Sequence, residues 1–401
     1  MKRMFEIILL FISLLAFASA IWIVVPAPSA AIWLFAVAAS EWSLWIAIIA
    51  LGCIAPCTFY IISGNGGKLS VISAMFLTAA LGISFYPFVS TYKIARDNGI
   101  KLSFSRYFAG VTNPAKSVES KTYTFSNIDG VDLKLDAYLP TQTNSNNGAS
   151  VIVVHGGSWA KGDRSDFPQW NELLAANGYT VFDIDYRLSP QPNYLTATSD
   201  VKCAISWVQR NSRQLEIDLE RVAILGRSAG AHLALLAAYS TGDERLPSSC
   251  PASVPSANIR AVISLYAPVE LLWAYDNPAN ERVINGPQTL SDFLGGSPHH
   301  SNDLRERYDL ASPTTHVNAQ TPPTLIIHGG KDQLVRTENL QFLDQKLTTF
   351  NVPHQTLLFP YAQHGFDYNQ NGWASQITEK VLLDFLRKNT MANSATDSSE
   401  F

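Results

Sequence analysis

Three long apolar runs near the N-terminus constrain this chain more than any other feature. They cover residues 5–25, 42–62 and 69–89. A transmembrane helix needs about 20 apolar residues, so each run is long enough to cross a bilayer. We therefore predict a membrane region at 1–92 with about three transmembrane helices, followed by a linker at 93–118.

The segment between the first two runs, PAPSAAIWLFAVAASE, is apolar but short before Glu41. An acidic residue deep in lipid costs a few kcal/mol, so Glu41 is expected to mark a boundary. The segment is then interfacial, re-entrant or part of a longer tilted helix. A cleaved signal peptide is an alternative for the first run, because Lys2 and Arg3 precede it and residues 18–20 are Ala-Ser-Ala.

The positive charges leave the membrane orientation open. Lys2 and Arg3 place the N-terminus in the cytoplasm, and a basic group after the third run favours the same side (Lys93, Arg96, Lys101 and Arg106). Both ends on one side require an even number of spans, whereas the number of clear runs is odd. We expect a multi-pass membrane protein that contacts membrane lipid, with the side of the remaining chain undetermined.

Beyond about residue 116 the pattern becomes that of a soluble α/β protein. Short apolar strands alternate with segments of helical spacing, and Asp129-Gly130 predicts a hairpin between 123–127 and 131–138. Such alternation builds a mostly parallel sheet with helices on both faces. We expect further strands at 151–154, 180–185, 222–225, 261–266, 324–327 and 355–359, and helices at 167–177, 199–210, 229–239, 337–350 and 375–388.

Charge and cysteine content restrict the function further. The formal net charge is −4, and no basic run with interleaved aromatic residues occurs, so nothing indicates nucleic-acid binding. The sequence has no CxxC motif and no Cys/His cluster, and we predict neither a metal site nor a cofactor. The pattern does not decide whether Cys203 or Cys250 forms a disulfide, nor the oligomeric state.

Three of the predicted strands end in unusual turns. VIVV is followed by HGGSW (155–159), VAIL by GRSAG (226–230) and TLII by HGGKD (328–332). Ligands of such sheets bind beyond the carboxyl ends of the strands. The chemistry of this chain is therefore expected at these three turns.

The second turn places one serine where a strand passes directly into a helix. Gly226 and Gly230 leave room for so sharp a turn, and Ser228 at its apex projects over the sheet edge. The N-terminus of the following helix favours developing negative charge, and the N–H of Ala229 can hold an oxyanion. The alternative is a serine N-cap between incidental glycines.

A serine nucleophile needs a base, and the base needs an acid that orients it. Asp332 follows the strand TLII at the same sheet edge, and His364 follows the last strand in a loop that can reach the serine. The chain order Ser, Asp, His is the expected one for this architecture. Asp332 could instead cap the helix near Thr337, and His364 could be an ordinary surface residue.

The turn after VIVV is predicted to complete an oxyanion hole. Gly156, Gly157 and Ser158 can direct backbone N–H groups at the carbonyl oxygen, beside that of Ala229. The alternative is an ordinary tight turn. A phosphate-binding loop is excluded because neither GxGxxG nor GxxxxGKS/T occurs.

The motifs together resemble the α/β-hydrolase superfamily, in its esterase and lipase branch. HGGSW, DYRLSP, GRSAGAH, FLGGSP, ASPTTHV, HGGKDQLV and QHGF follow one another in that family's order. The HGGxW form is similar to feruloyl-esterase-like, kynurenine-formamidase-like and isoprenylcysteine-methylesterase-like members. The resemblance covers about residues 123–388 and implies a nucleophile at Ser228, an acid at Asp332, a base at His364 and an oxyanion hole.

The resemblance implies a catalytic domain at 119–390 before a disordered tail at 391–401, with a cap-like insertion at 269–317. Aromatic residues of the insertion could line an ester site or simply pack together (Trp273, Tyr275, Phe293 and Tyr308). We expect a carboxylic ester hydrolase acting through an acyl-enzyme on a small-molecule ester, free or carried by lipid. Amide or peptide hydrolysis on the same triad is the alternative, and a non-catalytic membrane-tethered binding module is a third reading.

Overall fold

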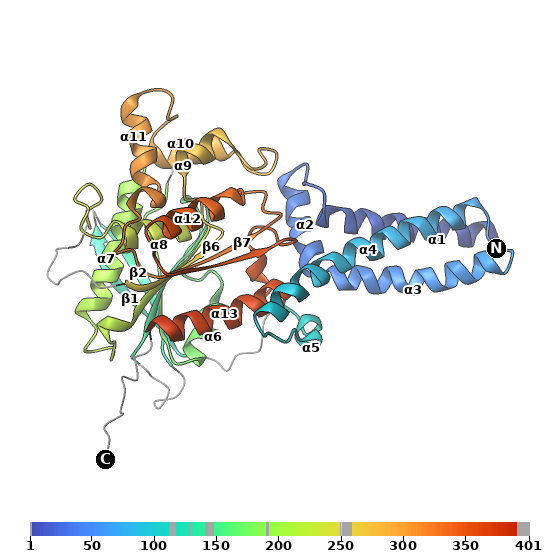
Figure 1. Cartoon of the computed structure of the whole chain (residues 1–401), viewed down its shortest axis with the longest axis horizontal. Coiled ribbons are helices and arrows are strands. Elements are labelled where there is room, and N and C mark those ends of the chain that lie inside the picture. Colours follow the sequence, from blue (N-terminus) through green and yellow to red (C-terminus); the bar gives the residue numbers. More distant parts are fainter. Residues whose placement is uncertain are drawn as a thin grey trace, which may run out of the picture.

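Residues 118–390, called the hydrolase domain below after the family that they resemble, are built on one eight-stranded sheet (Figure 1). This computed structural model describes residues 2–111, 118–128, 130–140, 148–189, 192–248, 250 and 259–390. The strand order is β1-β2-β4-β3-β5-β6-β7-β8; β2 pairs antiparallel with both β1 and β4, and the other neighbours are parallel. The strands are β1 (Ser120–Ile128), β2 (Val131–Tyr138), β3 (Ser150–Val154), β4 (Thr180–Ile184), β5 (Val222–Arg227), β6 (Ile259–Leu265), β7 (Thr324–Gly329) and β8 (His354–Phe359).

Helices cover both faces of this sheet, which confirms the predicted fold class. One face packs against α7 (Tyr194–Arg210), α8 (Ala229–Tyr239) and α12 (Glu338–Thr349), and the other against α6 (Pro168–Ala176) and α13 (Trp373–Thr390). The β3, β5 and β6 strands are buried along nearly their whole length, as expected for parallel strands covered on both sides. The remaining helical elements of this part are η2 (Leu219–Arg221), α9 (Leu271–Asp276), α10 (Gly286–Leu294), α11 (Asn302–Ala311), η3 (Pro313–His316) and η4 (Phe366–Tyr368).

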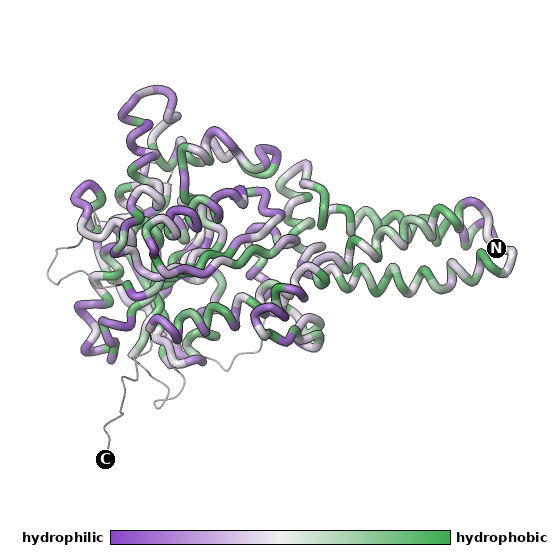
Figure 2. The backbone as a smooth tube through the Cα atoms, in the orientation of Figure 1, coloured by the Kyte–Doolittle hydropathy of each residue, from purple (hydrophilic) through white to green (hydrophobic). Residues whose placement is uncertain are grey.

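The N-terminal region is a bundle of three long helices that extends away from the hydrolase domain (Figure 1). α1 (Lys2–Ala20), continued by η1 (Ile21–Ile23), α3 (Ser43–Ile62) and α4 (Lys68–Asp97) are each long and apolar enough to cross a membrane. Figure 2 shows that hydrophobic residues cover most of this bundle. Many large apolar side chains on it are exposed, for example Phe59 at 75% and Ile62 at 80%. A surface of this kind is stable in lipid rather than in water.

The short apolar segment before Glu41 forms a helix of its own, α2 (Ala30–Glu41), at the end of the bundle nearest the hydrolase domain (Figure 1). The side chain of Ser29 caps it by accepting the N–H of Ile32 at 3.4 Å. Twelve residues are too few to span a bilayer. Glu41 ends this helix and is buried against Gly372 of the hydrolase domain, because that glycine leaves space for its carboxylate.

The residues after the third span dock on the hydrolase domain, where the sequence predicted a linker from residue 93. α4 continues past the predicted end at residue 89, and α5 (Phe104–Phe108) follows. The ring of Tyr107 stacks on Trp373 of α13 with centroids 4.2 Å apart, and the Tyr107 hydroxyl accepts the N–H of Leu44 at 3.1 Å. Aromatic burial of this kind stabilises a fixed contact.

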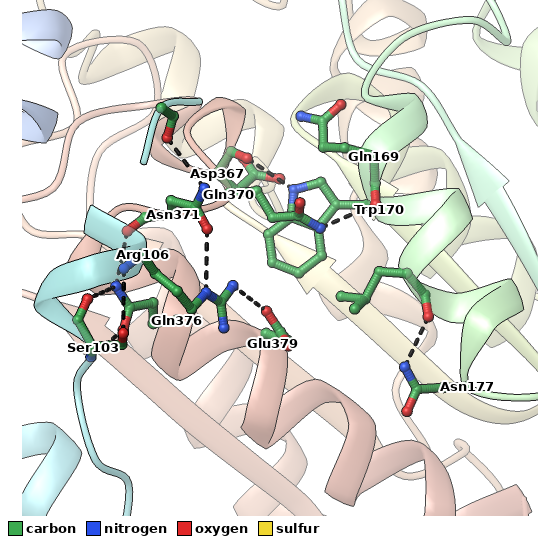
Figure 3. A network of polar contacts seen from close by, with 12 residues as sticks. Ser103, Arg106, Gln169, Trp170, Asn177, Asp367, Gln370, Asn371, Gln376 and Glu379 are labelled. Atoms are coloured by element: carbon green, nitrogen blue, oxygen red, sulfur yellow. Dashed lines mark hydrogen bonds and ion pairs between the residues drawn. The ribbon is translucent and has the colours of Figure 1, made fainter. Parts of the chain in front are cut away.

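Polar contacts reinforce the docking of α5 on α13 (Figure 3). Arg106 forms an ion pair with Glu379 at 2.6 Å and donates to Asn371 at 3.2 Å. The side chain of Gln376 accepts the backbone N–H of Ser103 at 2.7 Å and donates to its carbonyl oxygen at 3.1 Å. The N-terminal helix bundle is therefore held against the hydrolase domain at several points. The predicted tail at 391–401 lies outside the described residues.

Candidate active site

Ser228 lies at the apex of the turn from β5 to α8, with φ 53° and ψ −122°. A left-handed backbone at a non-glycine residue is strained, and such strain clusters at functional sites. Both flanking glycines are needed for space. A Cβ at Gly226 would lie 2.3 Å from the carbonyl oxygen of Gly230, and one at Gly230 would lie 2.2 Å from that of Val154. The two glycines therefore provide the space that the strained conformation of Ser228 requires.

His364 and Asp332 lie in line with this serine, although they are far from it in sequence. Nε2 of His364 is 2.9 Å from Oγ of Ser228, and its Nδ1 is 2.7 Å from Oδ2 of Asp332. The histidine loop follows β8 and the acid loop follows β7, so both reach the carboxyl edge of the sheet. The three predicted side chains form one hydrogen-bonded chain.

The surroundings of Asp332 keep its carboxylate ionised. Burial by itself raises the pKa of Asp332, but the charge of His364 and hydrogen bonds from His328 and His364 outweigh it and lower the pKa. Oδ1 also accepts the N–H groups of Leu334 at 2.8 Å and Val335 at 2.9 Å. An ionised Asp332 accepts a hydrogen bond from Nδ1–H of His364, which fixes the tautomer in which Nε2 can accept the hydroxyl proton of Ser228.

The turn after β3 passes close to the nucleophile. A Cβ at Gly156 would lie 3.1 Å from the carbonyl oxygen of Arg227, and Gly157 has φ 110°. Ser158 and Ala229 line the same cleft as Ser228. Within the described part of the chain, the backbone N–H groups of Gly157 and Ser158 donate no hydrogen bond to another backbone group. These donors are therefore available to a bound oxyanion.

A buried contact fixes this turn against the nucleophile helix. Nε1 of Trp159 donates to Nδ1 of His232 at 3.2 Å, and Nε2 of His232 lies 2.8 Å from the carbonyl oxygen of Ala311. Burial lowers the pKa of His232 to about 4, so the ring is neutral and can accept at one nitrogen and donate at the other. Trp159 also stacks on Phe293 with centroids 4.2 Å apart. His232 thus has a positioning role.

The insertion at 269–317 supplies much of the cleft beside Ser228. The lining is largely apolar and includes Trp159, Pro268, Trp273, Ile284, Leu290 and Leu334. The aromatic residues of the insertion divide between the two roles left open by the sequence. Trp273 lines the cleft, whereas Phe293 and Tyr308 are fully buried in the core and Tyr275 packs edge-on against Tyr308. An apolar cleft with few polar groups suits the acyl part of an ester.

Sequence reasoning missed a buried group beneath the histidine. Tyr266 follows β6 with φ 45°, and its ring lies 4.4 Å from that of His364. Its hydroxyl donates to Asp367 at 2.5 Å, and Asp367 also pairs with Arg227 at 2.6 Å. The positive φ of Tyr266 arises only in the folded chain. The one signal in the sequence was the position of Tyr266 at the end of the predicted strand 261–266, whose carboxyl end lies at the same edge of the sheet as Ser228.

The remaining candidates have structural positions. His155 donates a ring N–H to the carbonyl oxygen of Gly156 at 2.7 Å, and His328 lies 3.0 Å from that of Val335, so each organises its own turn. Cys203 and Cys250 form a disulfide with Cα atoms 5.1 Å apart. Among the described residues, no group of three or more His, Cys, Asp and Glu side chains could hold a metal ion.

Comparisons with known proteins show similarity to esterases over much of the chain. The BD-FAE family model matches residues 135–347, and the dienelactone hydrolase family model matches residues 308–389. Esterase LipC of Mycobacterium tuberculosis is 31% identical over 222 residues, which cover 54% of this chain and 53% of LipC. Probable carboxylic ester hydrolase LipM of the same organism is 29% identical, and the match covers 54% of this chain and 49% of LipM. The chain thus spans about half the length of these relatives.

Solved structures show the same architecture. Thermogutta terrifontis esterase 2 phosphorylated by paraoxon is 26% identical, with a TM-score of 0.54, over 67% of this chain and 94% of that chain. An acetyl ester-xyloside bifunctional hydrolase from Caldicellulosiruptor lactoaceticus is 22% identical and shares the fold with a TM-score of 0.56, over 68% of this chain and 97% of that chain. Since the BD-FAE model covers more than half of the sequence, the chain belongs to the BD-FAE family, in the esterase and lipase branch of the α/β-hydrolases.

Proposed function

We propose that this protein is a membrane-anchored serine hydrolase that cleaves carboxylic esters. The observation that carries the proposal is the continuous contact from Asp332 through His364 to Ser228, at 2.7 and 2.9 Å. The esterase names of LipC and of the Thermogutta enzyme support an ester rather than an amide. The apolar cleft beside the serine supports an acyl substrate.

The mechanism follows from these positions. Nε2 of His364 takes the proton of Ser228, whose Oγ attacks the ester carbonyl carbon and forms a tetrahedral oxyanion. His364 then gives that proton to the departing alkoxide, and an acyl-enzyme remains. Water, deprotonated by His364, attacks the acyl-enzyme and releases the carboxylic acid. Asp332 holds the imidazole in the required tautomer throughout.

The backbone N–H groups of Gly157, Ser158 and Ala229 are proposed to hold the oxyanion. Gly156 takes part by bringing the turn close to Ser228, rather than by lining the cleft. Donors fixed before the reaction need no reorganisation, and the loss of one costs roughly 3 kcal/mol of transition-state stabilisation. Trp159, held by His232, keeps two of these donors in place.

We further propose that residues 1–92 anchor the enzyme in the membrane and that residues 119–390 form the catalytic domain. Three helices of suitable length and hydropathy support the anchor. The fixed contacts of Tyr107 and Arg106 support a rigid attachment between the two parts.

The decisive experiment removes the nucleophile. Ser228→Ala should lower kcat for p-nitrophenyl acetate by about a millionfold, because the loss of a triad serine abolishes the covalent route. The matched control is Ser206→Ala on α7, whose hydroxyl bonds only to the Lys202 carbonyl oxygen among the described contacts and should leave kcat unchanged. Equal rates for Ser228→Ala and the wild type would sink the proposal.

A labelling experiment separates the alternatives. Wild-type protein should be phosphorylated by paraoxon at Ser228, as the Thermogutta enzyme is phosphorylated, and Ser228→Ala should remain unlabelled. Absence of labelling would favour a binding module without catalysis. Faster turnover of aryl formamides or peptides than of matched esters would favour the amide hydrolase instead.

A further inference from the structure

A second cavity lies where the membrane region meets the acid loop. This junction cavity is lined by residues 24–27 between η1 and α2, by Asn280 and Arg282 of the insertion, and by residues 330–333. Its volume is about 480 Å³. It adjoins the catalytic cleft, because Ala279 and Arg336 line both.

Buried hydrogen bonds fasten the membrane side of this cavity to the catalytic loops. The backbone N–H of Ala27 donates to Oε1 of Gln333 at 2.7 Å, and Nδ2 of Asn280 donates to both the carbonyl oxygen of Ala27 and Oε1 of Gln333 at 2.8 Å. Nε2 of Gln333 donates to Oε1 of Gln363 at 3.1 Å. Gln333 and Gln363 immediately follow the acid and precede the base. Residues 24–27 therefore form one fixed wall of the junction cavity, beside the loops of Asp332 and His364.

Residues 24–27 also lie beside the N-terminal helix bundle. Val24, Val25 and Pro26 come directly after the first span, and Val25 is 41% exposed. Figure 2 shows the largely hydrophobic bundle meeting the more polar hydrolase domain at one end of the bundle. A molecule leaving the leaflet beside the domain therefore meets an apolar edge first and the acid loop next.

The charges in the cavity leave a positive surplus. Three cations line the cavity, Arg282, Lys331 and Arg336, against the two carboxylates of Asp332 and Glu338, so the surplus is one positive charge. Glu338 forms an ion pair with Arg336. Arg282 and Lys331 form no ion pair within the described part of the chain. Two unpaired cations beside an apolar edge match an anionic headgroup on an apolar tail.

We propose that the junction cavity binds the phosphate-bearing headgroup of a membrane-borne ester, whose acyl ester then enters the catalytic cleft past Ala279 and Arg336. This inference rests on the proposed esterase function. It makes the membrane region part of the substrate site as well as an anchor. The substrate class is a phosphorylated glycerolipid or a lipid of the same chemistry.

The test uses the full chain reconstituted in vesicles of dialkyl ether phosphatidylcholine, which contains no ester. Didecanoyl phosphatidic acid is the probe, and fatty-acid release is measured and divided by the rate on p-nitrophenyl acetate. Arg282→Ala/Lys331→Ala should lower this ratio at least about tenfold, since a lost charge-assisted hydrogen bond weakens binding by about that factor. The matched control, Arg305→Ala/Lys346→Ala, removes two exposed cations elsewhere and should keep the ratio.

Further arms identify the headgroup and its source. Didecanoylglycerol lacks the phosphate, so the double variant should not change its ratio. Val25→Asp should lower the rate on vesicle-borne didecanoyl phosphatidic acid relative to monomeric dibutanoyl phosphatidic acid, because it places a charge at the apolar edge. Unchanged ratios in both variants, or equal losses on both phosphatidic acids, would overturn the inference. Failure of the wild type on p-nitrophenyl acetate would overturn the esterase proposal instead.

A separate observation assigns the membrane orientation. α1 runs towards the hydrolase domain, α3 runs away from it and α4 returns, so three crossings put the Lys2 end and the domain on opposite sides (Figure 1). The disulfide between Cys203 and Cys250 lies in the domain, and disulfides persist in oxidising compartments. We infer from the disulfide that the hydrolase domain lies outside the cytoplasm, with Lys2, Arg3 and Lys68 inside. The basic residues after α4 would by charge alone favour the opposite placement (Lys93, Arg96, Lys101 and Arg106).

Single added cysteines test this orientation in intact bacterial cells. A membrane-impermeant maleimide should label Lys346→Cys on the exposed face of α12 and should leave Lys68→Cys unlabelled until the cells are lysed. Alkylation without reductant should also leave Cys203 and Cys250 unmodified. The reverse labelling pattern, or free thiols at both cysteines, would contradict the assignment.

Discussion

Two buried carboxyl groups, Asp332 in the acid loop and Glu41 at the domain junction, have opposite surroundings. Asp332 accepts hydrogen bonds from two backbone N–H groups and from His364. Burial raises its pKa, but the charge of His364 and hydrogen bonds from His328 and His364 outweigh burial and lower the pKa. Glu41 is only 2% exposed, and neither of its oxygens has a hydrogen-bond partner of standard geometry among the described residues. Burial raises the pKa of Glu41 well above its usual range, and the neighbouring Tyr361 hydroxyl offsets only part of this.

The difference shows that donors, rather than depth, decide the charge of a buried carboxyl group. The charge of His364 and hydrogen bonds from His328 and His364 lower the pKa of Asp332, which favours its ionised form. The raised pKa of Glu41 favours its neutral form, which can occupy the space left by Gly372 without a cation. The catalytic edge and the membrane junction thus use the same chemical group for opposite purposes.

The strongest test of this contrast exchanges the charge for an amide in both regions. Asp332→Asn should lower kcat roughly ten-thousandfold, because the amide no longer holds His364 in the productive tautomer. Glu41→Gln should leave kcat near the wild-type value, since its neutral carboxyl takes no part in proton transfer. Esterase assays at pH 7 measure both. Similar losses in the two variants would mean that the junction also governs the triad.

A smaller effect, on stability, is expected from the buried ion pair between Arg227 and Asp367. Arg227, buried with Asp367 at 2.6 Å, compensates that carboxylate where Glu41 has no cation. Arg227→Met should lower the free energy of unfolding by about 3–5 kcal/mol, because it leaves Asp367 buried without a partner.

The exposed pair of Arg245 and Asp243, also 2.6 Å apart, supplies the control. Arg245→Met should cost far less than Arg227→Met, since Arg245 is exposed and water screens its pair. Denaturant unfolding in detergent measures both variants. Equal costs would show that burial of the Arg227 pair has no special weight.

The smallest effect is the pH dependence of stability due to Glu41. Its pKa in the folded chain is raised above the unfolded value, so its contribution to stability is complete below that value and is lost as pH rises. Glu41→Gln should therefore melt at a higher temperature than the wild type at pH 8, and the difference should vanish towards pH 4.

Thermal scans across this range, with the exposed Glu244→Gln as control, provide the measurement. A gap between Glu41→Gln and wild type that does not change with pH would mean that Glu41 does not titrate at the junction.

Local sequence predicted much of the site. The glycines on either side of Ser228 indicated a tight turn. A side chain at Gly226 or Gly230 would clash with nearby backbone atoms. Asp332 and His364 were found from their places after strands, because carboxyl ends of parallel strands share one edge. The α/β alternation predicted the sheet for the same reason.

Other features arise from packing between distant segments. No local pattern joins Ala27 to Gln333, and the pairing of Cys203 with Cys250 depends on where the helix and the loop meet. Likewise, the sequence placed α5 in a linker, whereas in the structure Tyr107 of α5 stacks on Trp373. Residues of the membrane region thereby enter the core beneath the sheet.

The sequence by itself determined the two parts of this protein and the chemistry of one edge, since apolar length, strand alternation and glycine turns are local properties of a chain. Only the tertiary structure decided how the parts join: which donors surround each buried carboxyl group, which residues line the cavity at the junction and which loop contacts the triad. Those depend on the donors and walls that remote segments bring together, and no short stretch of sequence contains them.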